Sequence, residues 1–221
     1  MTTLASPPVS TLIERLFADA DRTQSAFRAE RARLAPAERA ARMGDAADYK
    51  SFYMTHAKNV HLAVSRETAK LLYMLGRSMS ARSIVEFGTS FGISTLHLAA
   101  AVKDNGGGRV IGTEFEPGKA ERARANLSAA GLAELVEIRE GDALETLSRD
   151  LPETIDLVLL DGAKTLYARV LSLLAPHLRA GALIVADNAN MCPEYLARVG
   201  SPGSGYLSMT LGGDVELTMK A

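Results

Sequence analysis

The chain has 221 residues, of which 47% are hydrophobic, and its formal net charge at pH 7 is −1. This length suits one domain that buries its own core without disulfides or structural metals. The balanced charge argues against a nucleic-acid-binding protein, in which Lys and Arg would be in excess on one face.

Cysteine usage and apolar runs bear on the compartment. The single cysteine, Cys192, excludes an internal disulfide and favours a reducing environment. Residues 1–10 lack the apolar core of a signal peptide, and no later run has the length of a membrane span. We therefore expect a cytoplasmic protein whose partners are neither nucleic acids nor membranes.

The N-terminal third of the chain predicts helices. Apolar residues recur at helical spacing from Leu12 to Phe17 and again from Ala69 to Gly76. Pro36 and the stretch Met43–Asp45 are typical of breaks between helices. We expect three or four helices over residues 11–75, which form either a packing layer on a sheet or a lid and dimer surface.

From residue 83 onward, short apolar strands alternate with helices, which is typical of an α/β protein. The expected strands are Ser83–Phe87, Arg109–Glu114, Val136–Ile138, Ile155–Leu160, Ala182–Ala186, Gly205–Thr210 and Val215–Lys220. The later strands are almost continuously apolar, as in a parallel sheet that is covered on both faces. The last two flank a Gly-Gly turn and predict an antiparallel hairpin at the edge of the sheet.

Acidic residues stand at or near the carboxyl ends of five successive strands. They are Glu86, Glu114, Asp142, Asp161 and Asp187. Ligands of open parallel sheets bind at this edge. One such carboxylate could be only a helix cap, but five in series predict a polar ligand, a cation, or both.

The first strand leads into a glycine-containing turn in which Gly88 and Gly92 allow a tight bend and close helix packing. Its spacing differs from the G-x-G-x-x-G turn that binds a diphosphate, and its acid suits a cofactor that carries an amino acid and a sulfonium. Glu114 could accept hydrogen bonds from ribose hydroxyls, or cap the helix that Pro117 opens. Asp142 could bind an adenine amino group, serve as an N-cap, or do both.

Residues 83–190 resemble the class I S-adenosylmethionine-dependent methyltransferases, specifically the metal-dependent catechol and caffeoyl-CoA O-methyltransferase superfamily. The matching segments are Val85–Thr95, the strand end at Glu114, Gly141–Ala143, Leu160–Lys164 with Tyr167, and Ala186–Asn188. Upstream, Ala63–Ser65 with Leu71 and Leu72 resembles the segment that closes over the methionine part of the cofactor.

The resemblance implies a single methyltransferase domain over residues 1–221, with N-terminal helices or a lid at 1–75 and a cofactor-binding core at 83–221. The implied fold is a Rossmann-like, doubly wound, mostly parallel seven-stranded sheet with an antiparallel C-terminal edge hairpin and an N-terminal helical layer. The helices of residues 1–75 are candidate contacts of a homodimer.

The resemblance also implies roles for individual residues. The implied cofactor-binding residues are Val64, Glu86, Gly88, Ser90, Ser94, Glu114, Phe115, Asp142, Ala143 and Asp161. A divalent cation, Mg²⁺ in most of the family, would be held by Asp161, Asp187 and Asn188, whose oxygens suit a hard ion. Lys164 matches the general base. Gly162 and Ala163 depart from the bulkier residues that members often carry, which puts the adenine side of the pocket in doubt.

These residues together predict a metal-dependent O-methyltransferase that acts on a small molecule with vicinal oxygens, either catechol-like or a natural-product intermediate. The alternative is the same fold and cofactor with an amine, sugar hydroxyl or macrolide hydroxyl as acceptor. Asp187–Asn188 alone could be a turn, and Lys164 alone an exposed lysine. The glycine spacing disfavours a nicotinamide oxidoreductase, and the filled cofactor and metal positions disfavour an inactive binding scaffold.

Overall fold

The structure, a computed structural model, describes residues 1–35, 38 and 49–221. The breaks expected at Pro36 and Met43–Asp45 lie outside these residues. The described strands are β1 Ser83–Phe87, β2 Arg109–Glu114, β3 Val136–Glu140, β4 Ile155–Leu160, β5 Leu178–Ala186, β6 Tyr206–Leu211 and β7 Val215–Lys220. The described α-helices are α1 Val9–Arg33, α3 Tyr49–Thr55, α4 Arg66–Ser78, α5 Ile93–Asp104, α6 Pro117–Ala129, α7 Ala143–Thr146, α8 Tyr167–Leu174 and α9 Pro193–Gly200.

The strands form one sheet in the order β3-β2-β1-β4-β5-β7-β6. The five strands β1 to β5 run parallel, whereas β7 is antiparallel to both β5 and β6. The order therefore reverses between β1 and β4, and a ligand cleft is expected at the carboxyl ends of those two strands. The predicted fold class is confirmed, including the antiparallel edge hairpin.

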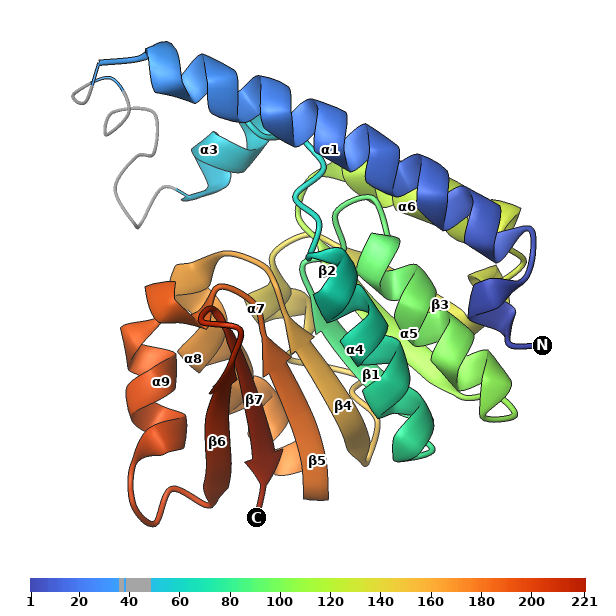
Figure 1. Ribbon diagram of the computed structural model, residues 1–221. Coiled ribbons are helices and arrows are strands. Elements are labelled where there is room, and N and C mark those ends of the chain that lie inside the picture. The colour runs from blue at the N-terminus through green and yellow to red at the C-terminus, as the bar shows by residue number, and fades with distance from the viewer. Residues whose placement is uncertain (36–37, 39–48) are drawn as a thin grey trace.

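Helices cover the sheet on both faces and create two separate cores (Figure 1). One core contains Ile84 of β1 with residues of α1, α4, α5 and α6. The other contains Val85 and Phe87 of β1 with residues of α7, α8 and α9. Successive side chains of a strand point to opposite faces, so β1 is buried on both sides and its carboxyl end is held firmly.

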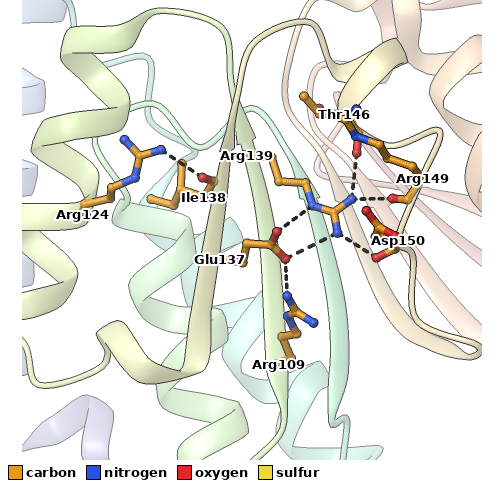
Figure 2. A network of polar contacts seen from close by, with 8 residues as sticks. All are labelled: Arg109, Arg124, Glu137, Ile138, Arg139, Thr146, Arg149 and Asp150. Carbon is orange, nitrogen blue, oxygen red and sulfur yellow. Dashed lines mark hydrogen bonds and ion pairs between the residues drawn. The ribbon is translucent and has the colours of Figure 1, made fainter.

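A network of polar contacts fastens the edge strand β3 to the segment after α7 (Figure 2). The guanidinium of Arg139 donates to Glu137 Oε1 at 3.1 Å and to the carbonyl oxygens of Thr146, Arg149 and Asp150 at 2.7, 2.8 and 2.7 Å. Arg109 of β2 pairs with the same Glu137 carboxylate at 2.5 Å. These contacts supply acceptors for a guanidinium whose side chain is only 9% exposed.

The bounds of most predicted strands agree with the structure to within one residue. The bounds of β1, β2, β4 and β7 are those expected, and β6 is displaced by one residue. The strand β5 begins at Leu178 rather than Ala182, because its first residues include Arg179 and Gly181 and break the apolar pattern. Among the described helices, none combines the length and the apolar character that a membrane crossing requires.

Candidate functional site

A cavity of about 900 Å³ lies at the carboxyl ends of β1, β2, β4 and β5. Most of the residues predicted to bind a cofactor or a cation line it together, namely Val64, Gly88, Ser90, Glu114, Phe115, Ala143, Asp161, Lys164, Asp187 and Asn188. Phe17, Gln24 and Phe27 of α1 also line this cavity. The N-terminal helices thus contribute to the cavity as well as to a packing layer.

The turn after β1 is in direct backbone contact with the end of β4. Gly88 has φ +99°, and a Cβ at this position would lie 2.5 Å from the carbonyl oxygen of Asp161, so only glycine fits. The Asp161 N–H donates to the carbonyl oxygen of Phe87 at 2.8 Å. The turn and Asp161 are therefore fixed relative to each other by backbone.

Glu86 and Ser94 lie behind this turn. The Glu86 side chain is fully buried and accepts hydrogen bonds from Thr89 Oγ1 at 2.9 Å, from Ser94 Oγ at 2.5 Å and from Thr95. Burial raises the pKa of Glu86. Neither Glu86 nor Ser94 is among the residues that line the cavity. In this arrangement both residues brace the turn from behind the cavity wall, and their predicted contacts with a cofactor stay a prediction.

Glu114, by contrast, lines the cavity at the end of β2. Its Oε2 accepts the Ser90 N–H at 2.7 Å and its Oε1 accepts the Glu116 N–H at 2.9 Å. Burial raises the pKa of Glu114, and these N–H groups act against that rise. The capping role considered for Glu114 belongs instead to Glu116, which accepts the Lys119 N–H at the start of α6.

Asp142 caps a helix and does not line the cavity. Its Oδ1 accepts the Leu144 N–H at 2.9 Å, which makes it the N-cap of α7 as one alternative predicted. Its Oδ2 pairs with Lys50 Nζ of α3 at 2.8 Å. The neighbours Gly141 and Ala143 do line the cavity, so the segment contributes to its wall although the Asp142 carboxylate is engaged elsewhere.

Two carboxylates and one ammonium meet at the ends of β4 and β5. Lys164 Nζ donates to Asp161 Oδ1 at 3.0 Å and to the Asp187 carbonyl oxygen at 3.1 Å. It also lies 2.7 Å from the hydroxyl of the fully buried Tyr167, which itself donates to the Asp187 carbonyl oxygen at 2.8 Å. Burial, followed by the neighbouring Asp161 carboxylate, raises the pKa of Asp187 to about 7.

Asn188 completes the predicted cation set on the same cavity wall. Its backbone is left-handed, with φ +50°, and its amide nitrogen lies 3.5 Å from Asp214 Oδ2. Two like charges at one site favour a cation between them, and carboxylate and amide oxygens suit a hard divalent ion. The donor chemistry therefore fits such an ion. Within the described ranges, no three His, Cys, Asp or Glu side chains form a metal-binding group, so the set depends on the amide.

Gly162 leaves room for an aromatic ring from β1. A Cβ on Gly162 would lie 2.4 Å from the Phe87 ring, which itself lines the cavity. The Phe87 side chain thus occupies the space that a bulkier residue at position 162 would need. The small residue at position 162, where family members often carry a bulkier one, is therefore accompanied by the Phe87 ring in the same part of the cavity wall.

Sequence reasoning missed several charged residues of the cavity wall, among them Lys119 and Asp214. Lys119 is 2% exposed although it belongs to a helix whose neighbouring charges are exposed. Asp214 lies in the turn between β6 and β7, where its carbonyl oxygen accepts the Ala189 N–H at 2.7 Å. A lysine in a charged helix and an aspartate in a turn are ordinary patterns, so the sequence carries no signal for either position.

Comparisons with known proteins find similar sequences and similar folds. A family model described as a methyltransferase domain matches residues 85–189. The catechol O-methyltransferase of Mycobacterium tuberculosis is 39% identical over 127 residues, which are 58% of this chain and 57% of that relative. The catechol O-methyltransferase of Niastella koreensis is 35% identical over 130 residues, which are 58% of each protein. The chain thus spans a little over half the length of these curated relatives.

Solved structures are similar over more of the chain. Cofactor-bound Rv0187 from MTB has 31% sequence identity and a TM-score of 0.65, and the match covers 72% of this chain and 81% of that one. The O-methyltransferase TomG of Streptomyces achromogenes, in complex with SAM, has 26% identity and a TM-score of 0.64. That match covers 91% of this chain and 98% of TomG, and so it extends into the N-terminal third of the chain.

Proposed function

This chain belongs to the class I S-adenosylmethionine-dependent O-methyltransferases of the catechol and caffeoyl-CoA type, and we propose that it methylates a hydroxyl of a small molecule with vicinal oxygens. The acceptor is a catechol-like phenol or a natural-product intermediate, and a divalent cation such as Mg²⁺ assists the transfer. The observation that carries this proposal is that Asp161, Lys164, Asp187 and Asn188 share one cavity with Gly88 and Glu114.

In this proposal Asp161, Asp187 and Asn188 hold the cation. A bound divalent ion would lower the pKa of an acceptor hydroxyl and orient its oxygen, as such ions do for water. The raised pKa of Asp187 supports the assignment, because a carboxylate crowded by a second carboxylate is stabilised by positive charge. Asp161 has two roles in this proposal. Its carboxylate holds the cation, and its backbone N–H fixes the end of β4 to the turn after β1.

In this scheme Lys164 first releases one ammonium proton to solvent, and the neutral amine then receives the proton of the acceptor hydroxyl. Its Nζ lies 3.0 Å from Asp161 Oδ1, next to the proposed cation ligands, and Tyr167 and the Asp187 carbonyl oxygen hold it there. The cofactor, when bound, would supply the methyl carbon, whose bond to sulfur would break as its bond to the hydroxyl oxygen forms. Holding donor and acceptor in line supplies much of the acceleration.

The deciding experiment is a methyl-transfer assay with catechol, caffeate, and amine and sugar acceptors, with and without Mg²⁺. We expect transfer to the diols, its loss on adding EDTA, and its return with excess Mg²⁺. Metal-independent transfer to an amine or a sugar hydroxyl would contradict the diol proposal and favour the alternative acceptor class.

The variant Asp187→Ala tests the cation ligands separately from the fold. We expect turnover to fall at least roughly 100-fold, because losing a ligand costs more than the 10–100-fold loss typical for a hydrogen-bond partner of a ligand. The affinity for S-adenosylhomocysteine, measured by calorimetry, should stay within about twofold. Glu153→Ala, which removes an exposed carboxylate away from the cavity, is the control. Equal loss of binding and turnover would instead assign Asp187 a folding role.

A further inference from the structure

Lys119 is a buried ammonium group on the cavity wall. The residue is 2% exposed, yet its Nζ forms no hydrogen bond or ion pair with any residue that the structure describes. Its Nζ lies 5.4 Å from the centroid of the Phe91 ring, and the carboxylates of Glu114, Glu116 and Asp161 act on it as nearby charges without a hydrogen bond. Lysine is almost never fully buried without a partner, because desolvating its charge is costly. An acceptor from a bound ligand would remove this cost.

The same short segment places Glu114 beside the same cavity. The Glu116 N–H donates to Glu114 Oε1 at 2.9 Å, and the Lys119 N–H donates to Glu116 Oε2 at 2.7 Å. These bonds fold the first turn of α6 back onto the end of β2. Burial lowers the pKa of Lys119, and the nearby Glu114 carboxylate opposes that shift. A half-buried anion and a buried cation therefore face one cavity from residues five positions apart.

A vicinal diol suits this pair of groups. Each hydroxyl both donates and accepts a hydrogen bond, whereas a carboxylate only accepts and an ammonium only donates. Each Glu114 oxygen already accepts one backbone N–H, from Ser90 or Glu116, which fixes the carboxylate and leaves further lone pairs available. Ser90 Oγ, buried beside them on this wall, has no hydrogen-bond partner among the described residues.

We propose that Lys119 and Glu114 together bind the ribose diol of the cofactor, with Glu114 accepting from the hydroxyls and Lys119 donating to a hydroxyl oxygen. The inference rests on the proposed function, because it takes S-adenosylmethionine as the cofactor. It assigns the ribose site a cation that neither the sequence pattern nor the resemblance indicates. The competing assignment, in which Lys119 pairs with the methionine carboxylate, is separated by the ligands used in the test.

The test measures four dissociation constants for the wild type and for Lys119→Met by calorimetry. The ligands are S-adenosylhomocysteine, its 2′-deoxy and 3′-deoxy forms, and 5′-methylthioadenosine, which keeps the ribose but lacks the carboxylate. We expect Lys119→Met to weaken S-adenosylhomocysteine and 5′-methylthioadenosine alike, by roughly tenfold or more, since a charged hydrogen bond is lost. In the wild type we expect at least one deoxy form to bind more weakly than S-adenosylhomocysteine, and this ratio of dissociation constants should fall by a similar factor in Lys119→Met.

Two further variants keep the result interpretable. Lys119→Gln retains a donor and should keep part of the preference over the deoxy forms, and it serves if Lys119→Met folds poorly. Lys103→Met removes an exposed lysine at the end of α5 and should leave every dissociation constant unchanged. Thermal midpoints of all variants show whether the fold is retained.

Several outcomes overturn the inference while leaving the proposed function intact. Unchanged affinity for S-adenosylhomocysteine in Lys119→Met would do so, and so would weakened affinity with full preference over both deoxy forms. Weakening confined to S-adenosylhomocysteine, with 5′-methylthioadenosine unaffected, would assign Lys119 to the carboxylate. A wild-type chain that binds none of the four ligands would contradict the proposed function, and this inference with it.

Discussion

Two buried cations in this molecule differ in where their acceptors come from. Arg139, at the sheet edge, donates to the Glu137 carboxylate and to three backbone carbonyl oxygens (Figure 2). Lys119, at the cavity, is buried more completely and has no such acceptor within the described residues. The acceptors of a buried cation with a structural role are groups of the protein itself. A buried cation that lines a cavity and has no acceptor in the protein indicates that a ligand supplies one.

Two strand-end carboxylates show the same contrast. Glu86 is surrounded by the hydroxyls of Thr89, Ser94 and Thr95 and lies behind the cavity wall. Glu114 accepts backbone N–H groups on one side and meets the cavity on the other. Both stand near the carboxyl end of a strand in the sequence. Only the hydrogen-bond partners of each carboxylate distinguish Glu86, which supports the turn, from Glu114, which lines the cavity.

The largest expected effect comes from removing the Arg139 guanidinium. The substitution Arg139→Met keeps the apolar stem but leaves Glu137 and the carbonyl oxygens of Thr146, Arg149 and Asp150 without their donor. We expect the free energy of unfolding, measured in urea, to fall by about 3 kcal/mol, because the half-buried Glu137 carboxylate and Thr146 carbonyl lose a charged donor and two exposed carbonyls lose theirs at the same time.

Arg124 supplies the matched control at the same edge. It donates to the Ile138 carbonyl oxygen at 3.0 Å and pairs with Glu140 at 3.3 Å, but its side chain is about half exposed (Figure 2). Arg124→Met should therefore cost less than about 1 kcal/mol. Equal losses for the two variants would contradict the distinction between a buried, fully partnered arginine and an exposed one.

An intermediate effect is expected from His61, a buried group that avoids an unpartnered charge by staying neutral. Its ring stacks on Phe91 with centroids 4.0 Å apart, and its Nε2 has no hydrogen-bond partner in the described part of the chain. Burial, followed by the charge of Arg122, lowers the pKa of His61 from 6.5 to about 4. Between these values the unfolded chain binds a proton that the folded chain does not.

The His61 contribution to stability is therefore fully present above pH 6.5 and is lost as the pH falls towards 4. The loss is at most about 3 kcal/mol from the size of the pKa shift. Urea unfolding of the wild type and of His61→Gln from pH 7 to pH 4 isolates it, with His177→Gln as the control for losing an imidazole. Parallel pH profiles for the wild type and His61→Gln would refute the assignment.

The smallest expected effect on stability is that of Lys119→Met. Replacing a desolvated, unpartnered ammonium by an apolar side chain favours folding, while Glu114 loses a neighbouring positive charge, and the two effects oppose each other. We expect the free energy of unfolding at pH 7 to stay within about 1 kcal/mol of the wild type. A loss comparable to that of Arg139→Met would show that Lys119 serves the fold.

The architecture could be predicted from the sequence because short, largely apolar strand segments alternate with helical segments along the chain. The predicted bounds of β1, β2, β4 and β7 match the structure, and Pro117 begins α6 as expected. The expected cation residues also gather on one wall, since the carboxyl ends of β4 and β5 are adjacent in the sheet. In a parallel sheet, residues at the carboxyl ends of adjacent strands lie close together, so their proximity follows from the predicted topology alone.

What the sequence could not supply is the partner of each polar group. It did not show that the hydroxyls of Ser94 and its neighbours take up the Glu86 carboxylate, or that Lys50 takes an oxygen of Asp142. The sequence also contains no pattern that predicts burial of the Lys119 side chain. Pairing depends on side-chain direction across segments distant in the chain, which periodicity and motif spacing do not encode.

The contact between Gly88 and the Asp161 carbonyl has a consequence for how acceptor range can change. Main-chain atoms set the spacing between the two halves of the cavity, because the Asp161 N–H is bonded to Phe87 and the Asp187 N–H to Leu160 at 2.9 Å. Residues of α1 that face the same space are not part of this frame. Substitutions in α1 should therefore change the lining of the cavity while leaving the relative positions of Gly88, Asp161 and Asp187 unchanged.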